Sequence, residues 1–298
     1  MLAIVIPYYK LTYFKETLQS LANQTNKQFK VYIGDDASPK NPSLLIEKYK
    51  NKFDLEYHFF EENLGSISLT KQWDRCIALT NEEKWLMILG DDDYISPNFV
   101  EEFYNHLEKV NQLKINVIHF SVYVDKEGEL SKLYIHPRIE SSKDNFFRKF
   151  FGGVHGSLSE QIFKKEVYLK QGFRNLPLAW GADDLAWLEF TDFGEIYGIN
   201  EANSYFRISS ENISRSGYKS ELKKEAKYSI FKLLVKDYLD KFNKDQRLML
   251  ILHYEKLTLR LNKMTIFKWL EICKLYYFEK EYLYIKKSLK KALKYLLK

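Results

Sequence analysis

The sequence predicts an α/β fold in which a mostly parallel sheet is flanked by helices and followed by a helical C-terminal extension. Short apolar runs of strand type alternate with amphipathic helical stretches along residues 1–124, and the connections between them are short. This alternation is typical of a parallel sheet covered by helices, in which ligands bind beyond the carboxyl ends of the strands. From Lys219 onward the pattern is almost wholly helical. The 298 residues suffice for one large domain with an appendage.

Strand and helix patterns alternate in order from the N-terminus. Leu2–Pro7 is apolar until Pro7 stops the run, which indicates a buried strand. Thr12–Asn23 has the spacing of an amphipathic helix, and Phe29–Asp35 is the next strand-like run. The same two patterns then predict the helices Pro42–Phe53, Ser66–Thr80 and Asn98–Val110 and the strands Leu55–Glu61, Lys84–Leu89 and Asn116–Val124.

A change of pattern follows these elements. Asp125–Ser142 is polar and irregular, and the aromatic stretch Phe146–Phe151 comes after it. We therefore expect one domain over residues 1–218, divided into halves 1–124 and 125–218, and a separate region over residues 219–298. Apolar residues at three- and four-residue spacing predict helices there, within Tyr228–Tyr238, Leu248–Leu261 and Ile266–Leu297.

Composition and charge exclude several classes of protein. Hydrophobic residues make up 45% and aromatic residues 16%, so the chain is neither fibrous nor disordered. Residues 219–298 carry 21 Lys+Arg and 9 Asp+Glu, a formal charge of +12, which leaves −6 for residues 1–218. The basic region is either an appendage that seeks an anionic surface or a solvated lysine-rich helix.

Cysteine use and hydropathy indicate the compartment. Cys76 and Cys273 are too far apart in sequence to suggest a disulfide framework or a metal site, which favours a reducing environment. The apolar run at the N-terminus is too short for a signal peptide, and no stretch is apolar enough to cross a membrane. We expect a cytoplasmic protein, at the inner face of the cell membrane if it attaches peripherally.

Three acidic clusters lie at predicted element ends. Asp35 and Asp36 end one strand, Asp91–Asp93 follow another, and Asp183 and Asp184 open a helix. Carboxylates in these places can bind a nucleotide, hold Mn²⁺ or Mg²⁺, or act as a general base. Each cluster also has a structural alternative, as the cap of a turn or helix or as a solvated acidic turn.

Histidines offer fewer candidates. His58, His119 and His253 are expected to be structural, because each is isolated or lies in an apolar strand. His155 differs because it lies in the glycine-rich loop from Gly152 to Ser157, where the backbone can approach a ligand closely.

The ordered motifs resemble those of family 2 glycosyltransferases with the GT-A fold, a Rossmann-like sheet flanked by helices. The resemblance covers about residues 1–215 and rests on five motifs in sequence order: Ile4 to Tyr9, Asp35 to Ser38, Asn63 to Gly65, Gly90 to Asp93 with Pro97, and Asp183 with Asp184.

The resemblance implies a role for each matching residue. Asp184 matches the catalytic base, with Asp183 beside it, and Asp92 matches the metal ligand, with Asp93 as a substitute. His155 and Arg207 are expected near the acceptor or the diphosphate. The expected nucleotide-binding residues are Pro7, Tyr9, Asp35, Asp36, Asn63 and Asp91. Gly90 replaces the first aspartate of the family's DxD motif and Ser209 replaces a frequent histidine, so a thinner metal shell is expected.

The implied activity is transfer of a sugar, with inversion, from a nucleotide diphosphate donor, most often a UDP-sugar, to an acceptor hydroxyl. The resemblance implies a Mn²⁺ or Mg²⁺ cofactor, a saccharide or lipid-linked saccharide acceptor, and a role in bacterial surface polysaccharide synthesis. Residues 1–124 would bind the nucleotide-sugar and residues 125–218 the acceptor.

Two alternatives remain open at this point. A metal-dependent nucleotidyltransferase would normally have a glycine-rich, basic phosphate loop near the first strand, which Pro7 to Leu11 does not provide. A non-enzymatic protein could act through its basic tail. The acidic body argues against nucleic acid as its partner. In Ile266–Lys298, apolar stripes among lysines are typical of a helix at a membrane surface.

Overall fold

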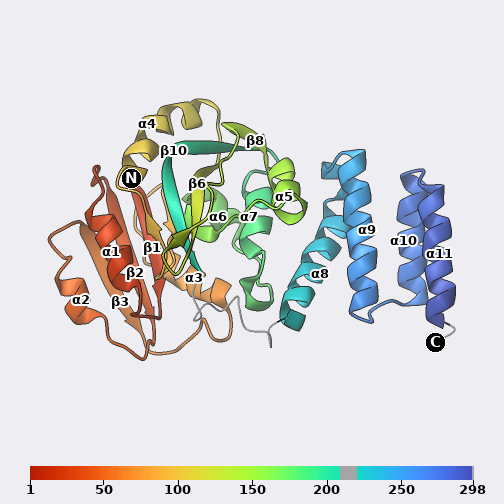
Figure 1. Cartoon of the computed structure of the whole chain (residues 1–298), viewed down its shortest axis with the longest axis horizontal. Coiled ribbons are helices and arrows are strands. Elements are labelled where there is room, and N and C mark those ends of the chain that lie inside the picture. The colour runs from red at the N-terminus through yellow and green to blue at the C-terminus, as the bar shows by residue number, and fades with distance from the viewer. Residues whose placement is uncertain (209–219, 297–298) are drawn as a thin grey trace. The chain divides into compact units, whose positions relative to one another are not determined.

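The computed structural model describes residues 1–208 and 220–296, and these form two compact units. The first unit holds residues 1–175 and 182–208, and the second holds residues 176–181 and 220–296. Figure 1 shows the strands gathered in the first unit and the last four helices in the second. The predicted α/β fold with a helical C-terminal region is confirmed.

One sheet organises the first unit, with the strand order β3-β2-β1-β4-β9-β6-β10-β5. β3, β2, β1 and β4 run parallel to one another, β6 and β10 also run parallel to each other, and β5 is antiparallel to β10. β9 runs antiparallel between β4 and β6, and two short strands, β7 and β8, pair with β6 and β10. The strands are β1 (Leu2–Tyr8), β2 (Phe29–Asp36), β3 (Asp54–Phe60), β4 (Trp85–Ile88), β5 (Tyr94–Ile95), β6 (Val117–Lys126), β7 (Glu129–Leu130), β8 (Ile139–Ser141), β9 (Gln161–Lys164) and β10 (Glu195–Ile208).

Helices cover both faces of this sheet. Alternate residues of β1 enter two different cores, because successive side chains of a strand point to opposite faces. Leu2, Ile4 and Ile6 pack in the core that includes α1 and α4, whereas Ala3 and Val5 pack in the core that includes α3 and α7. The helices are α1 (Phe14–Ala22), α2 (Ser43–Glu47), α3 (Leu69–Ile77), α4 (Phe99–Gln112), α5 (Ser142–Phe151), α6 (Lys165–Gln171) and α7 (Ala182–Phe190).

α2 is shorter than the predicted helix Pro42–Phe53. The chain leaves the helix after Glu47 and continues in turns as far as Phe53. Tyr49 and Phe53 are nonetheless buried in the same core as β1. The apolar residues that predicted a longer helix are therefore core residues, but those after Glu47 lie in turns and not in a helix.

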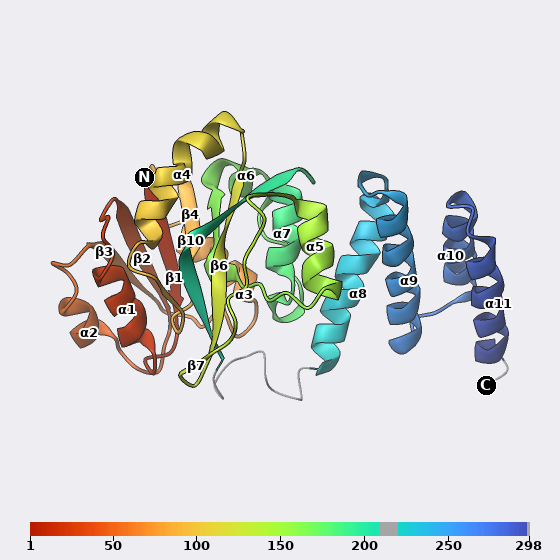
Figure 2. The same cartoon turned by 45° about the horizontal axis from the view of Figure 1, so that its top comes forward.

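The second unit consists of α8 (Ser220–Asp237), α9 (Lys244–Arg260), α10 (Ile266–Phe278) and α11 (Tyr282–Leu296), with the short helices η2 (Pro177–Ala179) and η5 (Leu239–Lys241). The predicted stretch Ile266–Leu297 is two helices, because Lys280 adopts a left-handed conformation (φ 61°) between them. In the turned view of Figure 2, α10 and α11 lie side by side. None of the helices described in the structure is long and apolar enough to span a membrane.

Candidate active site

The carboxyl ends of β2, β1 and β4 meet at one edge of the sheet, because these three strands are adjacent and parallel. The chain following β4 bends back to the end of β1. There, the Asp91 carboxylate oxygen Oδ2 accepts hydrogen bonds from the backbone N–H groups of Tyr9 and Lys10, both at 2.7 Å. Two of the predicted nucleotide-binding positions are thus joined directly.

Asp36 holds the Asn63-to-Gly65 motif at the same edge. Its carboxylate accepts hydrogen bonds from the backbone N–H groups of Leu64 (2.7 Å) and Gly65 (2.9 Å), and it pairs with Arg75. A Cβ at Gly65 would clash with Asp36 Oδ2, so only glycine permits this approach. Burial raises the pKa of Asp36, and these hydrogen-bond donors oppose that rise.

Asp35 and Asn63 support the turns on either side of Asp36. The Asp35 carboxylate accepts hydrogen bonds from the Ser38 backbone N–H (2.8 Å) and hydroxyl (3.0 Å), and from the Tyr57 hydroxyl (2.8 Å). The Asn63 side chain accepts one from the Ser66 backbone N–H at 2.8 Å. The Asp35 side chain therefore makes the turn contacts that the structural alternative predicts, and the Asn63 side chain makes a turn contact of its own.

The three aspartates that follow β4 have different environments. Asp93 is buried, and its carboxylate accepts hydrogen bonds from the Ser159 hydroxyl and the Arg207 backbone N–H. Burial and the charge of Asp92 raise the pKa of Asp91 to about 7 and the pKa of Asp93 well above its usual range. Asp92 is half-buried between them.

Gly90 is required by the packing of this acidic run. A Cβ there would lie 2.9 Å from Asp93 Oδ2 and 3.2 Å from Asp92 Oδ1. The Gly90 backbone N–H also donates to the Ser159 hydroxyl at 3.0 Å. The departure from the family's DxD pattern at this position is therefore built into the local fold.

Arg207 reaches the acidic run from β10. Its guanidinium Nε lies 3.6 Å from Asp125 Oδ2, and the group lies over the ring of Tyr13 at 4.2 Å. Its backbone contact with Asp93 joins two segments that are 114 residues apart in sequence. Ser209, the other residue in this predicted motif, lies outside the described residues.

Asp183 and Asp184 open α7 and share one cation. Lys149 Nζ of α5 lies 2.5 Å from Asp184 Oδ1 and 3.4 Å from Asp183 Oδ2. Burial alone would lower the pKa of Lys149. The charges of Asp183, Asp184 and Glu160 raise this pKa by more than burial lowers it, so the net shift is upward. Gly156 passes close by, because a Cβ there would lie 2.6 Å from Lys149 Cε.

Lys149 was not predicted from the sequence. It is one lysine among many and stands in an aromatic stretch, and no local pattern distinguishes it. Only the packing of α5 against α7 brings Lys149 to Asp183 and Asp184, and Figure 2 shows these two helices side by side.

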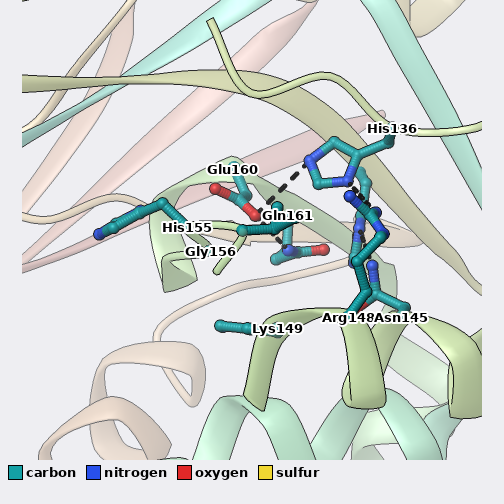
Figure 3. A pocket seen from close by; sticks show the side chains of 10 residues that line it. His136, Asn145, Arg148, Lys149, His155, Gly156, Glu160 and Gln161 are labelled. Carbon is teal, nitrogen blue, oxygen red and sulfur yellow. Dashed lines mark hydrogen bonds and ion pairs between the residues drawn. The ribbon is translucent and has the colours of Figure 1, made fainter. Parts of the chain in front are cut away.

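A small polar pocket adjoins this group (Figure 3). His155 lines it, and burial together with Lys149 lowers the pKa of the His155 imidazole to about 4. The short helix η1 (Leu158–Glu160) connects the two acidic centres, since Ser159 binds Asp93 while Glu160 interacts with Lys149. Burial raises the pKa of Glu160 to about 8.

The acidic run after β4 is thus linked through η1 to the Asp183–Asp184 pair. Residues 3–170, more than half of the chain, match the model of glycosyl transferase family 2. The chain belongs to glycosyl transferase family 2.

Curated relatives of this family 2 member are glycosyltransferases. The uncharacterized glycosyltransferase MJ1057 of Methanocaldococcus jannaschii is 25% identical over 225 residues, which cover 74% of this chain and 73% of that protein. The poly(ribitol-phosphate) beta-N-acetylglucosaminyltransferase TarS of Staphylococcus aureus is 29% identical over 104 residues, 34% of this chain and 18% of TarS.

Solved structures of another glycosyltransferase, TarS, share the fold. The crystal structure of S. aureus TarS 1–349 in complex with UDP-GlcNAc matches with a TM-score of 0.65 and 15% identity, and covers 92% of this chain and 79% of that one. A complex of the same protein with UDP matches with a TM-score of 0.57 and 16% identity over 98% of this chain and 91% of that one.

Proposed function

We propose that this family 2 glycosyltransferase moves a sugar from a UDP-sugar to an acceptor hydroxyl with inversion at the anomeric carbon. One observation carries the proposal: the strand-end carboxylates and the Asp183–Asp184 pair belong to one site, joined through η1. The UDP-GlcNAc and UDP complexes of TarS, which shares the fold, support UDP as the nucleotide.

The donor nucleotide would bind at the ends of β1 and β2. Tyr9 is 38% exposed, so its ring can stack on a base, and its backbone is anchored by Asp91. Pro7 lies two residues before it, near the end of β1. Asp35, Asp36 and Asn63 shape the turns around this position, and a carboxylate oxygen of Asp36 has a second lone pair for a base N–H.

The acidic run fits a divalent ion that takes few ligands from the protein. Both carboxylate oxygens of Asp93 already accept hydrogen bonds, so Asp93 could bind an ion only by giving one of them up. Asp92 is then the ligand that we assign to Mn²⁺ or Mg²⁺, together with phosphate oxygens of the donor, which such ions commonly take. When bound, the ion would offset the negative charge that develops on the departing diphosphate.

Asp184 would be the general base. The acceptor oxygen forms the new bond to the anomeric carbon, the bond to the diphosphate breaks, and the acceptor proton passes to the Asp184 carboxylate. Lys149 pairs with that carboxylate and orients it before the reaction, with Asp183 as the second carboxylate on the same ammonium. His155 and Arg207 would contact the acceptor or the diphosphate.

Product analysis tests the activity. We expect the protein, incubated with UDP-sugars and Mn²⁺ in the presence of saccharide acceptors, to release UDP. Release of pyrophosphate from a nucleoside triphosphate would instead support the nucleotidyltransferase. A lipid-linked acceptor of surface polysaccharide synthesis is the first acceptor to try, because of the surface features described below.

Lys149→Met should change the pH dependence of transfer. Among the described residues, Lys149 forms an ion pair with Asp184, and Asp183 and Glu160 are neighbouring carboxylates. An adjacent cation favours the charged form of a carboxylate, so its removal should move the acid limb of the kcat/KM profile to higher pH. Lys149→Arg is the control that keeps the charge. An acid limb unchanged in Lys149→Met, in a variant whose circular dichroism is native, would contradict the assigned role.

We further propose that α11 contacts an anionic membrane surface. At 100° per residue, Tyr282, Leu283, Leu289 and Leu293 fall on one face of the helix, and each is 49–62% exposed. Lys286 and Lys290 lie on the same face, whereas Ser288 and Ala292 on the opposite face are buried. An apolar stripe with lysines is typical of an interfacial helix, and each lysine adds about 1 kcal/mol near an anionic leaflet.

The triple variant Leu283→Gln, Leu289→Gln, Leu293→Gln should co-sediment less with anionic vesicles at low salt than the wild-type protein does. UDP-sugar binding should be retained, because the substituted residues are exposed and belong to the second unit. A control triple variant that replaces the exposed Leu44, Ile67 and Leu169 of the first unit should sediment like the wild type. Equal sedimentation of the α11 variant and the wild type would leave α11 as a purely structural helix.

A further inference from the structure

Three buried side chains from different segments point their ligand atoms toward one another beside the polar pocket of Figure 3. His119 comes from β6, His136 from the segment before β8, and Glu160 from η1. They are 2%, 6% and 1% exposed. One nitrogen of each imidazole and one oxygen of the carboxylate all lie within 4.8 Å of one another, and His136 Nε2 is 3.9 Å from Glu160 Oε1.

The imidazole Nε2 atoms lack hydrogen-bond partners within the described residues, whereas Glu160 Oε1 accepts a hydrogen bond from Gln161 Nε2 at 3.1 Å. His119 Nε2 and His136 Nε2 are buried without a hydrogen bond, and so is the neighbouring Gln161 Oε1. Buried polar atoms are nearly always satisfied by protein, water or a bound ion. Several unsatisfied atoms around one small space therefore indicate an occupant rather than a packing accident.

We propose that His119, His136 and Glu160 bind a divalent transition metal ion of the zinc type, separate from the ion assigned to Asp92. Two imidazole nitrogens with one carboxylate are a ligand set that zinc prefers, whereas magnesium takes oxygen ligands. Ligands of one tetrahedral zinc ion lie about 3 to 4 Å apart, so the separations here need to close only slightly.

The charges around this site favour a cation. Glu140, Asp183 and Asp184 contribute three carboxylates near the site, while Arg148 and Lys149 contribute two positive charges. An ion that binds the Glu160 carboxylate would take the place of its proton.

The surrounding groups can accommodate metal-bound imidazoles. A histidine that binds through Nε2 carries its proton on Nδ1, where it needs an acceptor. Arg148 Nη2 lies 3.0 Å from His136 Nδ1 but also 2.8 Å from Glu140 Oε2, so it can stay with Glu140 while the Phe120 carbonyl accepts from His136. The Asn145 amide nitrogen, 3.4 Å from His119 Nδ1, also donates to Glu140 Oε2 at 3.0 Å, so a proton on His119 Nδ1 would require this amide to turn and give up its bond to Glu140.

A second group of histidine and carboxylate side chains differs from this one in burial and in hydrogen bonding. Glu102, His106 and Glu201 also gather their ligand atoms, but none of the three is buried. His106 Nδ1 is already hydrogen-bonded with the Tyr197 hydroxyl at 3.0 Å, and Glu201 pairs with Arg138. That group is a satisfied surface network and we assign no ion to it.

Metal analysis of the full chain tests the proposal independently of sugar transfer. Untagged protein stripped with chelator, reloaded with zinc and dialysed should retain one equivalent by mass spectrometry. Cobalt(II) in place of zinc should give the visible absorption of a tetrahedral site. His136→Gln should lose both signals, and Asp92→Asn, which removes the ligand assigned to the other ion, should keep them.

The stripped wild-type protein provides a measurement that needs no variant, since its melting temperature should fall and should recover when zinc is added. This keeps the proposal testable if His136→Gln fails to fold. Failure of the wild type to retain zinc would overturn the inference, as would retention by folded His136→Gln or loss in Asp92→Asn. None of these outcomes depends on whether the chain transfers a sugar.

Discussion

Asp184→Asn should lower sugar transfer by about 10²- to 10⁴-fold, the usual contribution of a general base, while UDP-sugar binding is retained. Asparagine has nearly the same shape and can still accept a hydrogen bond from Lys149, so the packing of α5 against α7 should survive. It cannot take a proton from the acceptor. Isothermal titration with the UDP-sugar and steady-state assays of UDP release measure the two effects separately.

Asp183→Asn is the matched control for this prediction. Asp183 shares Lys149 with Asp184 but lies farther from it, at 3.4 Å against 2.5 Å. We expect a smaller loss of transfer in this variant. If Asp183→Asn were the damaging change and Asp184→Asn nearly silent, the base would be the other carboxylate. Loss of folded protein in both variants would favour a helix-capping role for the pair.

Asp92→Asn should lower transfer by about 10²-fold or more and should weaken Mn²⁺-dependent binding of UDP. A bound divalent ion contributes several kcal/mol of charge stabilisation in reactions of this kind, and Asp92 is its assigned carboxylate ligand. The effect should be largest at limiting Mn²⁺, so transfer and UDP binding are measured across a series of Mn²⁺ concentrations.

Asp93→Asn separates metal binding from local folding. An asparagine side chain at this position could not accept both hydrogen bonds that Asp93 receives from Ser159 and the Arg207 backbone, because its amide nitrogen is a donor. We expect this variant to melt at a lower temperature without a specific change in its Mn²⁺ dependence. Transfer by Asp92→Asn that equals the wild type at limiting Mn²⁺ would remove Asp92 from the metal site.

Local patterns in the sequence determined the order of elements and the edge of the sheet at which we propose that the donor binds. Leu2–Tyr8 and the next strands are short apolar runs whose alternate residues enter cores on opposite faces of the sheet, so their periodicity is visible in the chain itself. Parallel strands of this kind bring their carboxyl ends together. The neighbourhood of Tyr9, Asp36 and Asp91 therefore follows from strand order, as their predicted positions anticipated.

Tertiary structure alone decided the remaining features. The antiparallel strand β9 is only four residues long, Gln161–Lys164, and it pairs with β4 and β6, which are distant in sequence. Lys149 meets Asp184 from another helix, and His119, His136 and Glu160 meet from three segments. Such contacts leave no periodic signature, because hydrophobic periodicity records which face of an element is buried but carries no information on which distant polar group will face it.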